Sequence, residues 1–168
     1  MSIKSILLTL IVLSSGCATY IPLERLGNET KTTFTYDYEI ESTNQNKLWK
    51  SARDYFAGAY GDSKSVIRVI DESEGTIIGK GTFSWLMGSS QYTITCLTDY
   101  HIRFIAKDNK ARLQLEIINS VPPLSKCTGW PLPSKNGYDL MLKSFQANSN
   151  ALEIALNGGG STNDFKDF

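Results

Sequence analysis

The chain has 168 residues, of which 41% are hydrophobic and 20% are charged, and this length suits one domain with tails. Its 17 Lys and Arg residues balance 17 Asp and Glu residues, so the formal net charge is zero. A protein that holds a nucleic acid backbone needs a surface rich in Lys and Arg. The charge balance therefore argues against a nucleic acid partner.

The first 16 residues have the pattern of a signal peptide. Lys4 supplies a positive start, residues 6–13 form an apolar core of eight residues, and small residues follow. This core is far shorter than the ~20 apolar residues of a transmembrane helix. We therefore expect an exported chain from which residues 1–16 are removed.

The residues Ser14-Ser15-Gly16-Cys17 resemble the lipobox of bacterial lipoproteins, a family that usually has Leu where this chain has Ser14. The resemblance implies that the Cys17 thiol receives a diacylglyceryl group, that a signal peptidase cuts before Cys17, and that acyl chains such as palmitate anchor the protein in the bacterial cell envelope. Two or more acyl chains hold a protein firmly at a membrane, whereas one binds marginally. By resemblance to enterobacterial sorting, Ala18 favours the outer membrane over the inner one. The alternative is an ordinary secretory leader with a chance cysteine.

The segment after Cys17 is expected to be a tether. Residues 18–31 show no sustained periodicity and include Pro22 and Gly27. Such a composition is typical of a linker, so residues 17–31 are predicted to join the lipidated cysteine to a folded domain.

The domain is expected to begin with a strand and a helix. Residues 32–40 alternate between apolar and polar side chains, which predicts a half-buried strand. Ser42 and Gln45 have the spacing of a capping box, and Gly61 is placed as a helix C-cap. Apolar residues between them recur at helical spacing and predict an amphipathic helix.

Four extended segments are predicted next, over residues 65–71, 75–85, 91–107 and 111–119. The last two alternate strictly, and a register in which paired residue numbers sum to 217 places apolar side chains opposite each other. The pairs are Phe104 with Leu113, Ile102 with Leu115, and Tyr100 with Ile117. A slip of one residue would destroy all three pairs.

The remaining chain is predicted to form a loop, a second helix and a tail. Residues 121–137 hold four of the five prolines, residues 138–156 have helical periodicity, and residues 158–168 follow as a loose tail. The whole predicts an α+β domain over residues 32–157. Its order is strand, helix, four strands, helix, with two helices on one face of a five-stranded antiparallel sheet.

The central pattern resembles the DUF4468 domains, a bacterial family of unknown function described as having a TBP-like fold. The resemblance rests on the aromatic helix with Trp49, on the segment "SVIRVIDESEGTIIGKGTF", and on the alternating hairpin that follows. It covers about residues 32–120 and implies the fold. The family offers no catalytic residue to carry over.

Cys96 and Cys127 remain as a pair once Cys17 is acylated. In an oxidising compartment such a pair tends to form a disulfide, and the alternative is two buried free thiols. The sheet register extended past Tyr100 would place Val121 opposite Cys96. A zinc site is disfavoured because His101 is the single histidine, and no cofactor or metal is expected.

The glycines between Gly75 and Gly81 invite comparison with a phosphate-binding loop, but the motif needs a different spacing and a following helix. We expect instead that Gly79 and Gly81 leave room for an aromatic side chain from the first helix.

The polar side of the two long strands is the predicted binding face, and it carries Thr93, Thr95, Asp99, His101, Arg103, Arg112, Gln114 and Glu116. No catalytic constellation is recognisable, so we expect a non-catalytic envelope lipoprotein that either binds a protein or peptide or serves as an accessory in a larger assembly. His101 lies opposite Glu116 in the predicted register. The pair is interpreted as charged neighbours on a solvated face, and the alternative is an envelope hydrolase that uses both residues.

Overall fold

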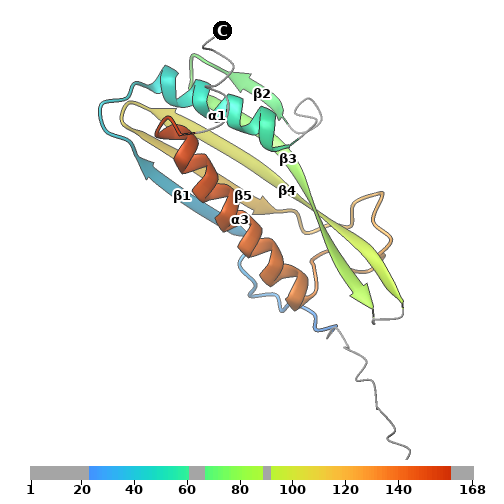
Figure 1. Cartoon of the computed structure of the whole chain (residues 1–168). Helices are drawn as coiled ribbons and strands as arrows, with labels where there is room; N and C mark the ends of the chain where they lie inside the picture. The colour runs from blue at the N-terminus through green and yellow to red at the C-terminus, as the bar shows by residue number, and fades with distance from the viewer. Residues whose placement is uncertain (1–22, 61–66, 89–91, 160–168) are drawn as a thin grey trace, which may run out of the picture.

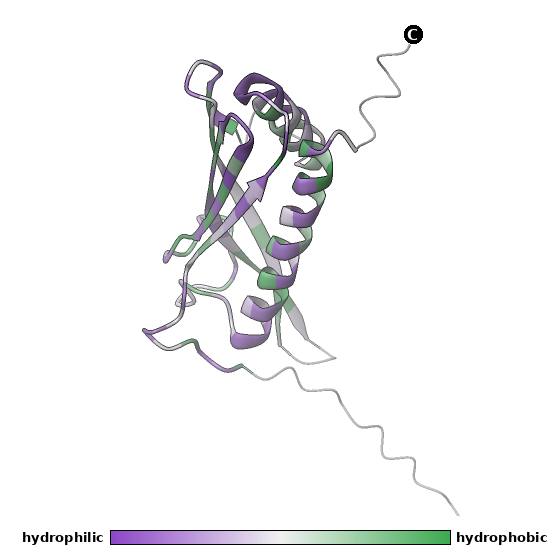
Figure 2. Ribbon diagram, turned by 90° about the vertical axis from the view of Figure 1, so that its left-hand side faces the viewer, coloured by the Kyte–Doolittle hydropathy of each residue, from purple (hydrophilic) through white to green (hydrophobic). Residues whose placement is uncertain are grey.

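The structure, a computed structural model, describes residues 23–60, 67–88 and 92–159. Within them, a five-stranded antiparallel sheet carries two helices on one face (Figures 1 and 2). The predicted signal peptide, the lipobox with Cys17, Gly61 and the tail from residue 160 lie outside the described residues. None of the described helices is long and apolar enough to cross a membrane.

The elements follow the predicted order. They are β1 (Thr33–Glu39), α1 (Gln45–Ala59), β2 (Ile67–Asp71), β3 (Thr76–Gly88), β4 (Thr93–Lys107), β5 (Lys110–Ile117) and α3 (Lys135–Leu156). In the sheet the strands lie in the order β1-β5-β4-β3-β2, so the first strand pairs with the last. The three predicted pairs between β4 and β5, including Phe104 with Leu113, are confirmed.

One face of the sheet is buried against the helices because apolar side chains alternate along β4 and β5 and recur at helical spacing on α1 and α3. Phe145 of α3 lies at the centre, with its ring 4.9 Å from that of Tyr100 and 5.8 Å from that of Phe34. We call the cluster the main core; it consists of Tyr38, Ile40, Leu48, Trp49, Ala52, Phe56, Ile77, Tyr100, Ile102, Phe104, Ala106, Ala111, Leu113, Leu115, Ile117, Met141, Phe145, Leu152 and Leu156.

Two tyrosine hydroxyls form hydrogen bonds that connect α3 to β1 and α1. The hydroxyl of Tyr38 in β1 lies 2.9 Å from the hydroxyl of Ser149, and the hydroxyl of Tyr55 in α1 donates to the carbonyl of Asn148 over 3.1 Å. Burial raises the pKa of both Tyr38 and Tyr55 to about 12. The helix is therefore held by directed bonds as well as by packing.

The start of α1 differs from the predicted capping box. Asn44 is the N-cap, and its side-chain oxygen accepts the N–H of Lys47 over 2.9 Å. Ser42 has φ of +56°, which a capping residue with extended backbone does not have. The prediction from the spacing of Ser42 and Gln45 was therefore wrong by two residues.

Gly81 makes room for an aromatic ring, as expected, but the ring comes from a different element. Gly81 pairs with Tyr100 of β4, and a Cβ atom at Gly81 would overlap the Tyr100 ring. The hydroxyl of Tyr100 in turn donates to the hydroxyl of Tyr60, at the end of α1. The neighbouring strand therefore supplies the aromatic that was expected from the first helix.

The hairpin of β3 and β4 extends beyond its neighbours. β2 pairs with β3 only as far as Gly79, and β5 ends at Ile117 opposite Tyr100. We call the extension, residues 83–88 and 92–98, the distal ribbon (Figure 1). Because β5 ends there, Cys96 pairs with Trp85 of β3 and has no strand partner at Val121, so that predicted pairing was wrong.

A second cluster forms where the segment between β5 and α3 folds onto the distal ribbon. Cys96 and Cys127 form the disulfide that the cysteine count predicted, with Cα atoms 5.3 Å apart. The Trp130 ring packs against the Trp85 ring, with centroids 5.9 Å apart. We call the four buried members of this group the distal cluster; they are Trp85, Met87, Cys96 and Cys127.

The end of the predicted tether is attached to this region. The carbonyl of Glu24 accepts the N–H of Lys135 over 2.9 Å, and Arg25 forms a β-bridge with Ser134. The Arg25 guanidinium donates to the carbonyl of Gly129 and lies 4.2 Å from the centre of the Trp130 ring. Within the predicted tether, the chain therefore contacts the domain from Glu24 onward.

Candidate functional site: the open face of the sheet

The face of the sheet opposite the helices is not covered by any described helix (Figure 2). We call it the open face. It collects every second residue of the long strands, because side chains alternate between the two faces of a sheet. Seven of the eight residues predicted for a binding face lie here at least partly exposed; they are Thr93, Thr95, His101, Arg103, Arg112, Gln114 and Glu116.

Asp99 is the exception, because its side chain is only 9% exposed. Lys80 of β3 places its ammonium nitrogen 2.5 Å from one carboxylate oxygen of Asp99, and the Thr82 hydroxyl donates to the other over 2.7 Å. The carbonyl of Asp99 accepts the N–H of Ile118, where the chain leaves β5. Asp99 therefore serves an internal network and is not offered to a partner.

Ion pairs cross the strands of the open face. Arg112 of β5 donates two hydrogen bonds to the carboxylate of Asp37 in β1, over 2.5 and 3.0 Å. These bonds hold the pKa of Asp37 below its ordinary value and raise the pKa of Arg112. Arg103 of β4 lies 3.4 Å from the carboxylate of Glu116 and 3.4 Å from the amide oxygen of Gln114. Arg112 and Arg103 thus each have a carboxylate of opposite sign beside them.

His101 and Glu116 are direct register neighbours on this face, as predicted. The carboxylate of Glu116, however, forms its ion pair with Arg103, and no described residue makes a hydrogen bond or an ion pair with the His101 side chain. A general base needs a hydrogen bond that orients it and a nearby proton to abstract. The geometry therefore does not assemble the pair that the hydrolase alternative requires.

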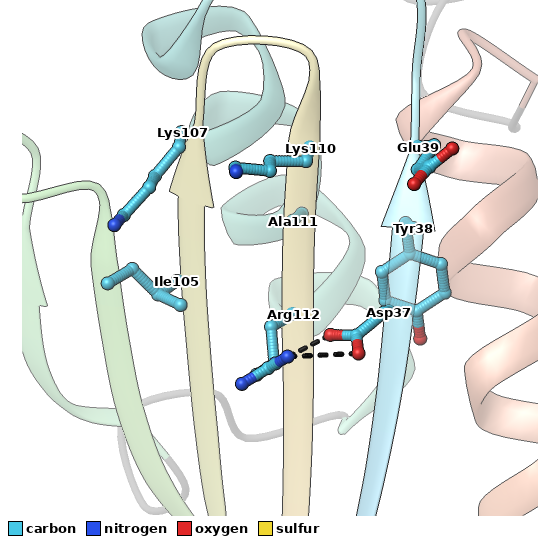
Figure 3. Close-up of a pocket in the computed structure, with 8 residues that line it drawn as sticks. All are labelled: Asp37, Tyr38, Glu39, Ile105, Lys107, Lys110, Ala111 and Arg112. Atoms are coloured by element: carbon cyan, nitrogen blue, oxygen red, sulfur yellow. Dashed lines mark hydrogen bonds and ion pairs between the residues drawn. The ribbon is translucent and has the colours of Figure 1, made fainter.

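A shallow hollow of about 520 Å³ lies on the open face near the turn between β4 and β5 (Figure 3). Ile105 and Ala111 contribute apolar surface, and three cations and two anions come from three strands. The charged lining residues are Asp37, Glu39, Lys107, Lys110 and Arg112. Lys107 and Lys110 pair in the register, and neither forms an ion pair with any described residue. The hollow is thus a mixed, open surface on which two lysines remain available.

Of the residues that line this hollow, only Arg112 was predicted to belong to the binding face. The register rule that pairs Phe104 with Leu113 also places Lys107 opposite Lys110, so this part of the hollow could be predicted from the sequence. Asp37 and Glu39 alternate with buried residues in β1, but nothing in the sequence indicates that β1 lies beside β5. The hollow depends on that neighbourhood.

The described residues contain no group of three or more His, Cys, Asp or Glu side chains that could hold a metal ion. The exposed residues predicted for the binding face carry charged, hydroxyl, imidazole or amide groups.

The comparisons with known proteins identify the fold and the family. The chain belongs to DUF4468, a domain of unknown function with TBP-like fold, which matches residues 34–120. No curated protein sequence matches the chain.

Two solved structures share the fold. A DUF4468 family protein from Bacteroides ovatus is 15% identical, with a TM-score of 0.53 over 88% of this chain and 93% of that chain. A TBP-like protein from Parabacteroides distasonis is 14% identical, with a TM-score of 0.52 over 72% of this chain and 91% of that chain. The similarity to the Bacteroides ovatus protein extends beyond the matched residues 34–120, so the common fold includes more than the family match covers.

Proposed function

We propose that this protein is a lipid-anchored lipoprotein of the bacterial envelope, most simply of the outer membrane, whose open face binds another envelope protein or peptide. The anchor rests on the lipobox that ends at Cys17. The disulfide between Cys96 and Cys127 supports export, because such bonds persist in oxidising compartments and are rare in the cytosol.

The open face is the observation that carries the binding function. It is broad and shallow, and its charged groups are spread over three strands with both signs present. Small-molecule sites are usually concave and mostly apolar, which this face is not. A polypeptide with alternating charges fits this face better. Its carboxylates would pair with Arg103, Arg112 and the two lysines of the hollow, and its cations would pair with the acidic residues.

The anchor is tested by labelling cells with radioactive palmitate. We expect label in the wild-type chain and none in Cys17→Ser, with the protein moving from the membrane fraction to the soluble fraction. Ser14→Leu is the matched control because it brings the lipobox closer to the family pattern, and it should label at least as well as wild type. A wild-type chain that takes no palmitate contradicts the anchor.

The binding function is tested by cross-linking in intact cells. The double variant Lys107→Glu with Lys110→Glu reverses the charge of the hollow, and Lys143→Glu makes a matched change on the exposed side of α3. We expect one cross-linked partner that is retained in Lys143→Glu and lost or strongly weakened in the double variant. A partner retained equally by all three proteins would place binding elsewhere.

A further inference from the structure

The distal ribbon belongs to a stretch without any charge. Residues 81–98 contain no Asp, Glu, Lys or Arg, whereas 20% of the whole chain is charged. Exposed strands of soluble proteins usually carry charged residues, above all lysine, which discourage unwanted association. An uncharged ribbon that extends beyond its neighbours is therefore suited to a contact in which charge would be costly.

Apolar side chains are exposed near the tip of this ribbon. Tyr92 is 82% exposed, Leu86 is 51% exposed and Ile94 is 42% exposed. Leu86 pairs with Thr95 on the open face, and Ile94 pairs with the buried Met87 on the opposite face. The tip thus presents apolar side chains on both faces of the ribbon. A partner that contacted only the open face would leave Ile94 exposed to water.

This tip lies at the end of the molecule where the chain enters the domain from the N-terminus (Figure 1). The contacts join the two directly, because Arg25 packs on Trp130 and Trp130 packs on Trp85, the neighbour of Leu86. Leu23, the first described residue, is itself 39% exposed. Exposed apolar side chains therefore lie both at the tip of the ribbon and at the first described residue of the chain.

The length of the preceding chain limits how far this end can stand from a lipid anchor. Leu23 lies six positions after Cys17, and at about 3.3–3.6 Å per residue this stretch spans at most about 22 Å. On the proposed lipidation of Cys17, the end of the molecule with the distal ribbon is held next to the bilayer.

We propose that the tip of the distal ribbon, through Leu86, Tyr92 and Ile94, docks into the phospholipid surface to which Cys17 anchors the protein. This inference rests on the proposed lipid anchor. Leucine and isoleucine favour the apolar boundary, and tyrosine is enriched at membrane interfaces because its ring is apolar and its hydroxyl stays wet. Because the ribbon carries no charge, inserting it requires no charged group to leave water.

The test places a fluorescent probe at the tip of the tethered protein. The mature chain, residues 17–168, is coupled through the Cys17 thiol to a maleimide lipid in phosphatidylcholine vesicles, which is selective because Cys96 and Cys127 are bonded to each other. Leu86→Trp reports the tip, and Ile154→Trp, at an exposed apolar position near the far end of α3, is the matched control. The emission of the parent protein is subtracted from each.

Brominated phosphatidylcholine is expected to quench about half of the emission added by Leu86→Trp, because interfacial side chains reach about 5–10 Å into the headgroup and acyl boundary. Emission added by Ile154→Trp should be unchanged. Adding Tyr92→Asp to Leu86→Trp should reduce the quenching to the control level, and circular dichroism verifies that each variant is folded.

Equal, weak quenching of Leu86→Trp and Ile154→Trp overturns the proposal. So does a blue shift of Leu86→Trp that depends on protein concentration without vesicles, because a second copy would then cover the tip. Chemical coupling supplies the anchor whether or not cells acylate Cys17. The palmitate experiment and this one therefore fail independently.

Discussion

Among the described residues, the main core buries 19 apolar side chains from four strands and both helices, whereas the distal cluster buries four. The main core needs no covalent bond, since each side chain packs against several elements. The distal cluster lies on a two-stranded ribbon, which is marginal in water without further support. The disulfide and the Trp85–Trp130 contact supply that support.

The contrast teaches that two parts of one sheet can be stabilised in different ways. Where five strands and two helices overlap, hydrophobic burial is sufficient. Where only β3 and β4 continue, one covalent bond replaces the missing layers.

The largest effect is expected in the main core. Phe145→Ala removes a ring that is 1% exposed and should lower the free energy of unfolding by about 3–5 kcal/mol. Urea unfolding followed by circular dichroism measures this loss. Ile154→Ala, on an exposed position of the same helix, is the control and should change the free energy by less than about 0.5 kcal/mol. A loss as small for Phe145→Ala would mean that the main core is not the dominant source of stability.

The next effect is expected at the disulfide. Replacing Cys96 and Cys127 by Ser should lower the free energy of unfolding by about 3–4 kcal/mol, the loop-closure value for a bond across this separation. Amide hydrogen exchange should show where the loss falls. We expect protection to decrease at Leu97, whose N–H donates to Ser125, and to persist at Ile102 and Phe104. A uniform decrease along β4 would show that the two parts of the sheet are not stabilised separately.

A smaller effect is expected where the glycine of β3 meets the tyrosine of β4. Gly81→Ala forces a Cβ atom onto the Tyr100 ring and should lower the free energy of unfolding by about 1–3 kcal/mol. Gly58→Ala is the control: its Cβ meets nothing within 4 Å in α1, and it should stabilise by about 0.5–1 kcal/mol. Thermal unfolding compares the two. The double variant Gly81→Ala with Tyr100→Leu should lose less than the sum of the single variants, and strict additivity would contradict the steric explanation.

The smallest effect concerns the bond between β1 and α3. Tyr38→Phe removes the hydrogen bond to Ser149 and should lower the free energy of unfolding by about 1 kcal/mol. Burial raises the pKa of Tyr38 from 10.0 to about 12, so the folded protein favours the neutral phenol. The stability that comes from keeping the Tyr38 phenol neutral is fully present below pH 10, the pKa of an ordinary tyrosine. It is lost as the pH rises toward 12, the pKa of Tyr38 in the folded protein. Urea midpoints measured across this range should fall less steeply in Tyr38→Phe than in wild type, and parallel curves would contradict the assignment.

The sequence alone was sufficient for the order of the elements and for the β4–β5 register, because strict alternation leaves one register in which Ile102 and Phe104 both face apolar partners. The disulfide was predicted only together with the lipidation of Cys17, which leaves Cys96 and Cys127 as a pair. These are properties of local pattern and of counting, and tertiary structure does not alter them.

Other features depended on neighbours that no local pattern reveals. Asp99 was predicted to be exposed from its parity in β4, but Lys80 and Thr82 of β3 enclose it. The helix was expected to begin at Ser42, but that residue has a left-handed backbone and Asn44 caps the helix. The hollow of the open face requires β1 beside β5, a pairing between the first and the last strand of the chain that only the folded protein establishes.

The length of β4 sets the distance between the distal ribbon and the hollow. The strand runs from Thr93 at the distal ribbon to Lys107 at the hollow. Its 15 residues are joined by 14 steps, which at about 3.3 Å each separate the two ends by about 46 Å. On the proposal that the tip of the ribbon rests on a bilayer, β4 would be a spacer that holds the hollow well clear of the lipid headgroups. A partner could then be met at a fixed height above the membrane, set by the number of residues in one strand.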